Sequence, residues 1–488
     1  MLIKNSFYTF LGMALPFVVG VVTVPLYISA IGAERYGALS IAWVLLGYFG
    51  QIDFGIGRAI TQRISALGGA RSRDCAGAVW SALASSALFG LVGGAVVYVG
   101  ARYFFSGPFQ LGASLRSELV ASVWALAICN PLVSLTGVTS GALIGIQRFR
   151  VVSIGTFISN TGLQLFPLLA AHLISHDLQV LILAALVARL LGIIIFGYSV
   201  WKNLLRGQPV LVLGAEVARL TNFGIWIMVS SFVGPLMMFA DRFVIGSLLG
   251  ALSVAAYTVP FQVAYRTQIL PLAITQVLFP RFASESAARS SERCGEFTVL
   301  IGQIFAPFMI GLTCLSGPLL KLWLGAHLDV RSVNVAQILF LGIWVNAVAQ
   351  IPFSYIQARG NSRFTAVLHI LELPIYVGLL IGLGVGYGLS GVAAAFSLRC
   401  GLDCAVLLLK ARICTRPVLL AVLSQVVILV ISLVVARTLD GWGELILAAA
   451  VLCAASLVFL VAQVPENVRV RLTALPGARF VPGLHRVT

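Results

Sequence analysis

Apolar residues follow one another in long runs, separated by short polar breaks, along almost the whole chain. A helix of about 20 residues spans a membrane core ~30 Å thick, whereas strands of a membrane barrel would alternate over about 10 residues. The pattern therefore predicts about fourteen membrane-spanning helices. Their expected ranges are 8–30, 36–60, 77–101, 117–145, 151–175, 178–202, 222–248, 252–278, 297–323, 333–356, 364–388, 390–412, 417–437 and 443–463.

Composition agrees with an all-α integral membrane protein. Hydrophobic residues make up 60% of the 488 residues and charged residues only 10%, against ~45–50% apolar residues in soluble domains. The first apolar run continues to Ile31 without a cleavage site, so we expect it to be retained as a helix. None of the eight cysteines forms a CxxC pair, so neither a disulfide framework nor a metal site is expected.

The net charge of +16 is unevenly distributed between alternate loops. With the N-terminus in the cytoplasm, cytoplasmic segments contain 21 Lys and Arg residues and the opposite segments contain 6. The positive-inside rule therefore predicts that both termini are cytoplasmic. No basic cluster is interleaved with aromatic residues, so nucleic acid is not an expected partner.

The two halves of the chain resemble each other. The tetrapeptide Ala-Ile-Thr-Gln occurs at 59–62 and again at 273–276, and its surroundings match at nearly constant offset. The matching pairs are Asn5 with Asn222, Pro16 with Pro235, and Gly32 with Gly250. Six helices separate the copies, which predicts two six-helix bundles related by a pseudo-two-fold axis along the membrane normal. The expected domains are 1–205 and 206–412, an additional helix pair at 413–465, and a cytoplasmic basic tail at 466–488.

Catalytic machinery is not evident in the sequence. No GxxxxGK[ST] phosphate loop is present, which argues against ATP hydrolysis by this chain. The loops are too short for an external catalytic domain. We therefore expect a protein that is not an enzyme.

Nine charged residues fall inside the expected helices. Each costs ~2.5–3.5 kcal/mol at a helix centre, so they are expected to face a bundle interior or a water-filled cavity. They are Arg58, Arg189, Arg242, Arg266, Arg399, Asp53, Asp241, Glu372 and Asp403. His369 lies one helical turn before Glu372, as either a proton-linked pair or a packed hydrogen-bonded pair.

Two groups of motifs resemble those of the bacterial polysaccharide flippases, which export lipid-linked O-antigen repeat units. The first group lies within residues 25–65 and the second within residues 241–284. The matching residues are Gly32, Tyr36, Gly37, Asp53, Gly55 and Arg58, then Asp241, Gly246, Gly250, Tyr257 and Pro280. These flippases belong to the multidrug/oligosaccharidyl-lipid/polysaccharide exporter superfamily.

This resemblance implies a flippase that moves undecaprenyl-diphosphate-linked oligosaccharides to the outer leaflet of a bacterial inner membrane. It would work as a monomer by alternating access through a central cationic cavity, in the same pathway as a polysaccharide polymerase and chain-length machinery. No cofactor is expected, and whether H⁺ or Na⁺ is coupled is left open.

The intramembrane charges can be given roles on this basis. Arginine donates paired hydrogen bonds to phosphate, so Arg266, Arg189 and Arg399 are the candidates for binding the diphosphate. Glu372 and His369 are the candidates for ion coupling. The residues assigned to gating or to contacts between bundles are Asp53, Arg58, Asp241, Arg242 and Asp403.

Two other function classes stay open at this point. One is a cation-coupled drug exporter with the same fold, against which the extra helix pair and the number of membrane arginines argue. The other is a membrane glycosyltransferase or polymerase, against which the short loops argue.

Overall fold

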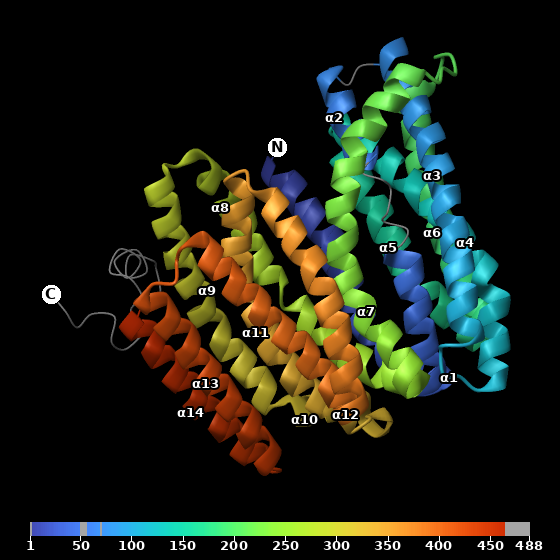
Figure 1. Cartoon of the computed structure of the whole chain (residues 1–488). Coiled ribbons are helices and arrows are strands. Elements are labelled where there is room, and N and C mark those ends of the chain that lie inside the picture. The colour runs from blue at the N-terminus through green and yellow to red at the C-terminus, as the bar shows by residue number, and fades with distance from the viewer. Residues whose placement is uncertain (1, 49–55, 69–70, 464–488) are drawn as a thin grey trace. The chain divides into compact units, whose positions relative to one another are not determined.

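The computed structural model describes residues 2–48, 56–68 and 71–463, and helices make up nearly all of this part of the chain (Figure 1). No strand occurs in these ranges, which agrees with the predicted all-α fold. The helices are α1 (Leu2–Tyr48), α2 (Ile56–Ala66), α3 (Arg73–Ser106), α4 (Ala113–Gly145), α5 (Phe149–Leu173), α6 (Leu178–Val200), η2 (Trp201–Leu205), α7 (Gly214–Arg266), α8 (Ile269–Ser284), α9 (Ala287–Cys314), α10 (Ser316–Leu324), η3 (Gly325–His327), α11 (Arg331–Ala358), α12 (Ser362–Ala411), α13 (Arg416–Thr438) and α14 (Trp442–Gln463).

Three of the long helical elements contain a glycine in a non-helical conformation. Gly32 in α1, Gly250 in α7 and Gly388 in α12 have φ values of 80°, 78° and 59°. Residues with a side chain rarely adopt such values, so glycine permits a sharp turn here. In the described residues, 11 helical stretches are long and apolar enough to cross a membrane. Three of them contain these glycines, and dividing each at its glycine gives the expected number of about fourteen segments.

The turn at Gly32 folds α1 back on itself. The ring centroids of Tyr27 and Trp43 are 5.2 Å apart. In a straight helix, positions 16 residues apart in the chain would lie about 24 Å apart along the axis. The two segments of α1 therefore form a helical hairpin, as expected from separate helices before and after this glycine.

The expected helix at 252–278 is interrupted in the structure, so the prediction of an unbroken helix was wrong here. α7 ends at Arg266 and α8 begins at Ile269. At the break, the buried side chain of Gln268 donates a hydrogen bond of 2.8 Å to the carbonyl oxygen of Ile343. Gln350 in turn donates to Gln268 Oε1 at 2.6 Å. These bonds to α11 stabilise a polar break that hydropathy alone does not reveal.

The chain divides into two compact units, Met1–Ala255 and Ala256–Thr488, called the first and second unit below. In the first unit, α3 packs along α4, and α5 packs along α6. The second segment of α1 approaches α7 so closely that a Cβ on Gly37 would lie 1.9 Å from the carbonyl oxygen of Ala251. Glycine is therefore required at position 37 for these backbones to pack as they do.

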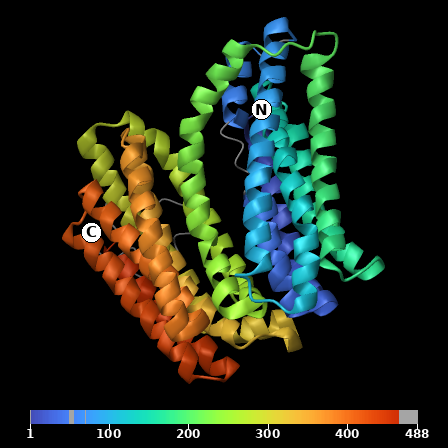
Figure 2. The same cartoon turned by 45° about the vertical axis from the view of Figure 1, so that its right-hand side comes forward.

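In the second unit, α11 packs against α8, α9 and α12, while α13 and α14 pack on α9. Figures 1 and 2 both show α13 and α14 side by side at the C-terminal end of the described chain. A buried polar network joins them to α9. Gln425 donates to Gln303 Oε1, and the hydroxyl of Ser456 donates to Gln425 Oε1 at 2.7 Å. Buried hydrogen bonds of this kind help to hold membrane helices together.

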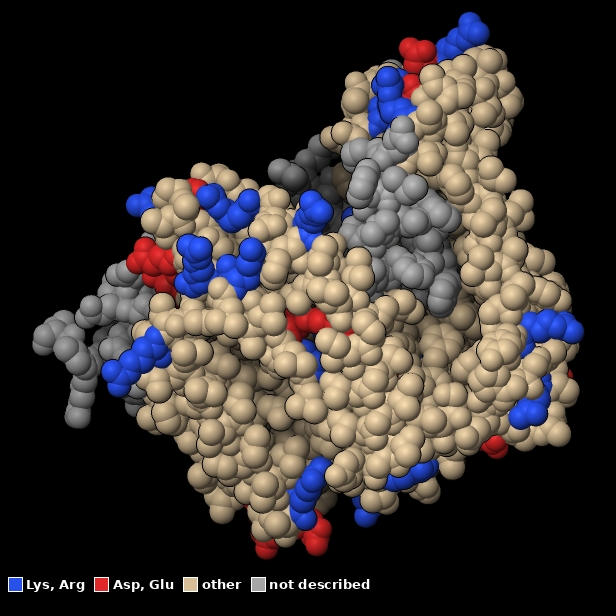
Figure 3. All heavy atoms as spheres, viewed as in Figure 1, with Lys and Arg blue, Asp and Glu red and all other residues tan. Residues whose placement is uncertain are grey.

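The expected domain boundaries follow the sequence repeat and stay predictions. The two units meet within α7, whereas the expected boundary is at 205/206. The expected basic tail, 466–488, lies outside the described residues. On the face drawn in Figure 3, most charged side chains lie toward helix ends, and the surface between them is largely uncharged. This distribution suits helices that span a bilayer.

Candidate functional site

Four ionisable side chains from one helical element meet in the interior of the second unit. His369 and Glu372 lie on the first segment of α12, and Arg399 and Asp403 lie on the segment after Gly388. A straight helix would separate His369 from Asp403 by about 50 Å, yet His369 Nε2 lies 3.9 Å from Asp403 Oδ1. The turn at Gly388 therefore brings the two pairs together. We call these four residues the α12 cluster.

Three members of the α12 cluster are buried, and His369 is partly buried. Glu372 and Arg399 each retain 8% of their accessible surface and Asp403 retains 4%. Among the described residues, Arg399 Nε has no hydrogen-bond partner, and the carboxyl groups of Glu372 and Asp403 lie within hydrogen-bonding reach of each other. Buried polar groups without partners are rare in structural networks and call for a functional explanation.

Aromatic rings surround the cluster. Phe353 of α11 stacks on the His369 ring, with a centroid distance of 5.5 Å and an interplanar angle of 9°. The Arg399 guanidinium lies 5.7 Å from the ring centroid of Tyr376 and 5.8 Å from that of Phe396. Such cation–π contacts favour a charged arginine away from water. Sequence reasoning missed these rings, although Tyr376 follows Glu372 by four residues and Phe396 precedes Arg399 by three, which places each pair on one helix face.

The acidic and imidazole groups of the cluster could also hold a cation. One ligand atom from each of His369, Glu372 and Asp403 lies within 4.8 Å of the others. With both carboxylates ionised and the imidazole neutral, Arg399 would balance only one of the two negative charges. One proton or one monovalent cation would therefore complete the balance of charge.

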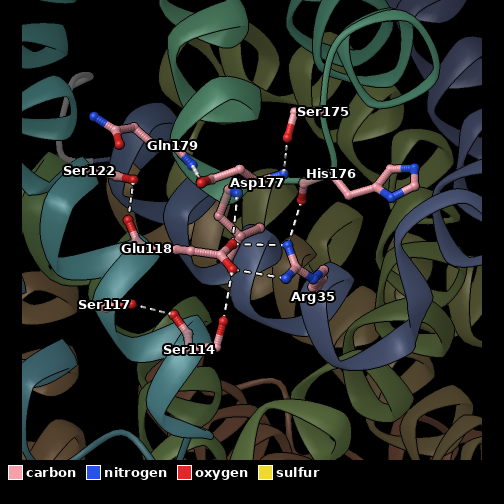
Figure 4. A network of polar contacts seen from close by, with 10 residues as sticks. Arg35, Ser114, Ser117, Glu118, Ser122, Ser175, His176, Asp177 and Gln179 are labelled. Atoms are coloured by element: carbon pink, nitrogen blue, oxygen red, sulfur yellow. Dashed lines mark hydrogen bonds and ion pairs between the residues drawn. The ribbon is translucent and has the colours of Figure 1, made fainter.

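A second charged group, in the first unit, differs from the cluster in being well satisfied (Figure 4). Arg35 donates to both carboxylate oxygens of Glu118, at 2.9 and 2.8 Å, and to the carbonyl oxygen of His176 at 2.6 Å. Glu118 also accepts from the backbone N–H of Leu178 at 3.0 Å. This network ties α1 to α4 and to the connection between α5 and α6. Its complete pairing favours a structural role.

None of the other predicted charges that the structure describes belongs to the α12 cluster. In the first unit, Asp241 and Arg242 form a buried pair on α7, with a distance of 3.1 Å between Arg242 Nη1 and Asp241 Oδ1. Arg189, on α6, is half-buried, and its Nε has no hydrogen-bond partner among the described residues. Arg58 is exposed in the first turn of α2. Asp53 lies outside the described residues.

Arg266 occupies a different position from the one expected. The sequence placed it near the middle of an unbroken helix, but it is the last residue of α7 and its side chain is exposed. Of the three predicted phosphate-binding arginines, only Arg399 belongs to the α12 cluster. The predicted ion-coupling pair, Glu372 and His369, is also in the cluster, so residues that were expected to have separate roles lie together in the structure.

The fold defines the class of protein. Superposition on the solved structure "Lipid II flippase MurJ, inward closed conformation" gives a TM-score of 0.71 at 14% identity, over 94% of this chain and 98% of that chain. An inward-facing multidrug resistance MATE family transporter of the MOP superfamily gives a TM-score of 0.64 at 15% identity, over 84% and 97%. The chain therefore has the fold of the MOP superfamily, which was expected from the sequence.

Sequence comparison identifies the family within this class. The family model described as "Polysaccharide biosynthesis protein" matches residues 2–286, more than half of the chain, and the protein belongs to this family. It is also 30% identical over 419 residues to the "Putative O-antigen transporter" of Shigella flexneri, covering 85% of this chain and 99% of that protein. The family predicted from the motifs is thereby confirmed.

Proposed function

We propose that the protein moves an undecaprenyl-diphosphate-linked oligosaccharide from the cytoplasmic to the outer leaflet of a bacterial inner membrane. Its family, its similarity to a protein named as an O-antigen transporter, and a fold shared with a lipid flippase support this function. The substrate combines a lipid tail with a charged diphosphate and a polar glycan. Unaided transfer would bring these polar groups into hydrocarbon at a cost of several kcal/mol for each unsatisfied group.

The α12 cluster is the observation on which the proposed mechanism rests. Two carboxylates face a single arginine in a buried site, so gain or loss of one positive charge changes the electrostatic free energy of that site strongly. If the two access states differ in their affinity for H⁺ or Na⁺ at the cluster, the ion gradient will favour one state over the other. We assign Glu372, Asp403 and His369 to this coupling, with Arg399 as their fixed counter-charge.

Arg189 and Arg266 are the proposed phosphate contacts. Each lies outside the α12 cluster, and Arg266 is exposed. Arg399, which the sequence also suggested as a phosphate contact, is a weaker candidate for that role because the carboxylates of the α12 cluster compete with phosphate for its guanidinium. Asp53, Arg58, Asp241 and Arg242 are retained as proposed gating residues, since breaking and remaking charge pairs is one way to separate two access states.

The proposal is tested by transport of a lipid-linked oligosaccharide in proteoliposomes, with an imposed H⁺ or Na⁺ gradient. Glu372→Gln and Asp403→Asn remove one charge each and should abolish the stimulation by the gradient. Glu444→Gln, an exposed acid in the first turn of α14, is the matched control and should transport normally.

Two results would decide against this mechanism. Gradient-driven transport that survives both cluster substitutions would exclude coupling at α12. Export of cationic dyes without movement of the lipid-linked oligosaccharide would instead favour a drug exporter with the same fold. Unfolding curves of the purified variants must accompany the assay, because removing one partner of a buried charge pair can destabilise a protein by about 3–5 kcal/mol.

A further inference from the structure

A cavity of about 740 Å³ opens at one end of the second unit, and none of the residues that line it has been assigned a role above. It is bounded by the beginning of α11, the residues on both sides of the α12 turn, and the end of α13. Its volume lies within the range of about 300–1,000 Å³ that is usual for small-molecule sites.

Opposite charges line this cavity at the level where α13 ends. Arg437 lies in the last turn of α13, and Asp440 follows in the loop to α14. Gln337 of α11 accepts a hydrogen bond from Arg437 Nε at 3.3 Å, which helps to orient the guanidinium. In the described part of the chain, no ion pair within 4.0 Å joins Arg437 to Asp440. The two charges are therefore available to different groups of one ligand.

Apart from Asn334, Tyr387 and Ser390, the rest of the wall is apolar, and it continues onto the outside of the helix. Leu383, Ile338 and Leu398 line the cavity, and Leu398 retains 53% of its accessible surface. Ser390 and Leu398 both lie on the second segment of α12, where eight residues correspond to about 12 Å along the axis. Tyr387, 74% exposed, stands beside the turn, and tyrosine is enriched where helices leave the membrane. An occupant would thus have a polar end at the interface and an apolar body beside α12.

We propose that this cavity binds a zwitterionic phospholipid with a primary ammonium group. The phosphate lies at Arg437, the ammonium donates to Asp440, and one acyl chain follows Leu383 and Leu398. A purely anionic headgroup would satisfy Arg437 but would be repelled by Asp440. A quaternary ammonium has no N–H to donate, so it would forgo the hydrogen bond to Asp440. This inference does not depend on the identity of the transported substrate.

The test measures which lipids the purified full-length chain retains, by native mass spectrometry from vesicles containing equal amounts of phosphatidylethanolamine, phosphatidylcholine and phosphatidylglycerol. The wild-type protein should retain phosphatidylethanolamine preferentially. Asp440→Asn should reduce its preference over phosphatidylcholine about tenfold, as expected for loss of a charged hydrogen bond. Arg437→Gln should weaken retention of all three lipids.

Two further variants separate binding in the cavity from general changes of charge or folding. Arg102→Gln alters an exposed arginine on α3 and should leave the lipid preference unchanged. Ala394→Phe fills the cavity without changing charge and should exclude the lipid. Equal retention of phosphatidylethanolamine and phosphatidylcholine by the wild-type chain, or unchanged retention by Ala394→Phe, would overturn the proposal.

Discussion

Replacement of Gly32 by alanine tests whether the α1 hairpin depends on a conformation that only glycine tolerates. Gly32 has φ 80° and ψ 159°, and an added Cβ would meet no atom within 4 Å. Steric crowding therefore does not contribute, and the backbone alone sets the effect. Holding alanine in this region costs about 1–3 kcal/mol, so Gly32→Ala should destabilise the protein by about that amount.

Gly100→Ala is the matched control for this experiment. Gly100 also has open space around a new Cβ, but it lies inside α3 without a positive φ, where alanine should stabilise the helix by about 0.5–1 kcal/mol. The two variants should differ by roughly 1.5–4 kcal/mol in denaturant titrations followed by tryptophan fluorescence. Equal stability of the two variants would refute the turn at Gly32.

Three other predictions concern charged and polar contacts. A double-mutant cycle of Arg35→Gln and Glu118→Gln, measured by unfolding, should give a coupling energy of about 1–3 kcal/mol, because the pair is bidentate and partly shielded from solvent. A coupling energy near zero would contradict a structural role. Gln425→Leu should destabilise the protein by about 1–2 kcal/mol, since it breaks the network between α9, α13 and α14, and unchanged unfolding would exclude that network. Hydrogen bonds from Arg331 lower the pKa of the Asp329 carboxyl, so this carboxylate stabilises the folded state above its unfolded pKa and loses that contribution as pH falls through its folded pKa. The stability difference between wild type and Asp329→Asn should accordingly shrink in acid, and a difference independent of pH would show that the carboxylate does not act through its charge.

The sequence was sufficient to predict most of the helices but not the meeting of the charges. Long apolar runs and helix-breaking glycines determine where segments begin and end, and these signals are local. The α12 cluster depends on how two segments align after a turn, which hydropathy does not describe. A further signal was nevertheless available: Glu372 lies 16 residues before Gly388 and Asp403 lies 15 after it. Residues at nearly equal distances from a tight hairpin turn lie at about the same level of the two segments, so the proximity of these two acids could have been predicted.

Other features could not have been read from the chain. The break between Arg266 and Ile269 is stabilised by the bond from Gln268 to a backbone carbonyl of α11, and such a contact joins residues far apart in sequence. The cavity at the end of the second unit likewise requires three separate helix ends to lie together. Arg437 is one of the six Lys and Arg residues counted in the segments opposite the cytoplasmic ones. Its contact with Gln337 and its position near Asp440 in the cavity wall are visible only in three dimensions.

The glycine turns are stronger evidence for an internal duplication than the repeated tetrapeptide. Gly32 and Gly250 lie 218 residues apart and have similar backbone angles, φ 80° and ψ 159° against φ 78° and ψ 174°. A chance match of four common residues would not reproduce an unusual conformation at the same offset. The two copies of the tetrapeptide are separated by 214 residues, four fewer than the two glycines. Four residues correspond to about one helical turn. In the second copy a break precedes α8, and a shift of about one helical turn at this break leaves the facing of the next helix nearly unaltered.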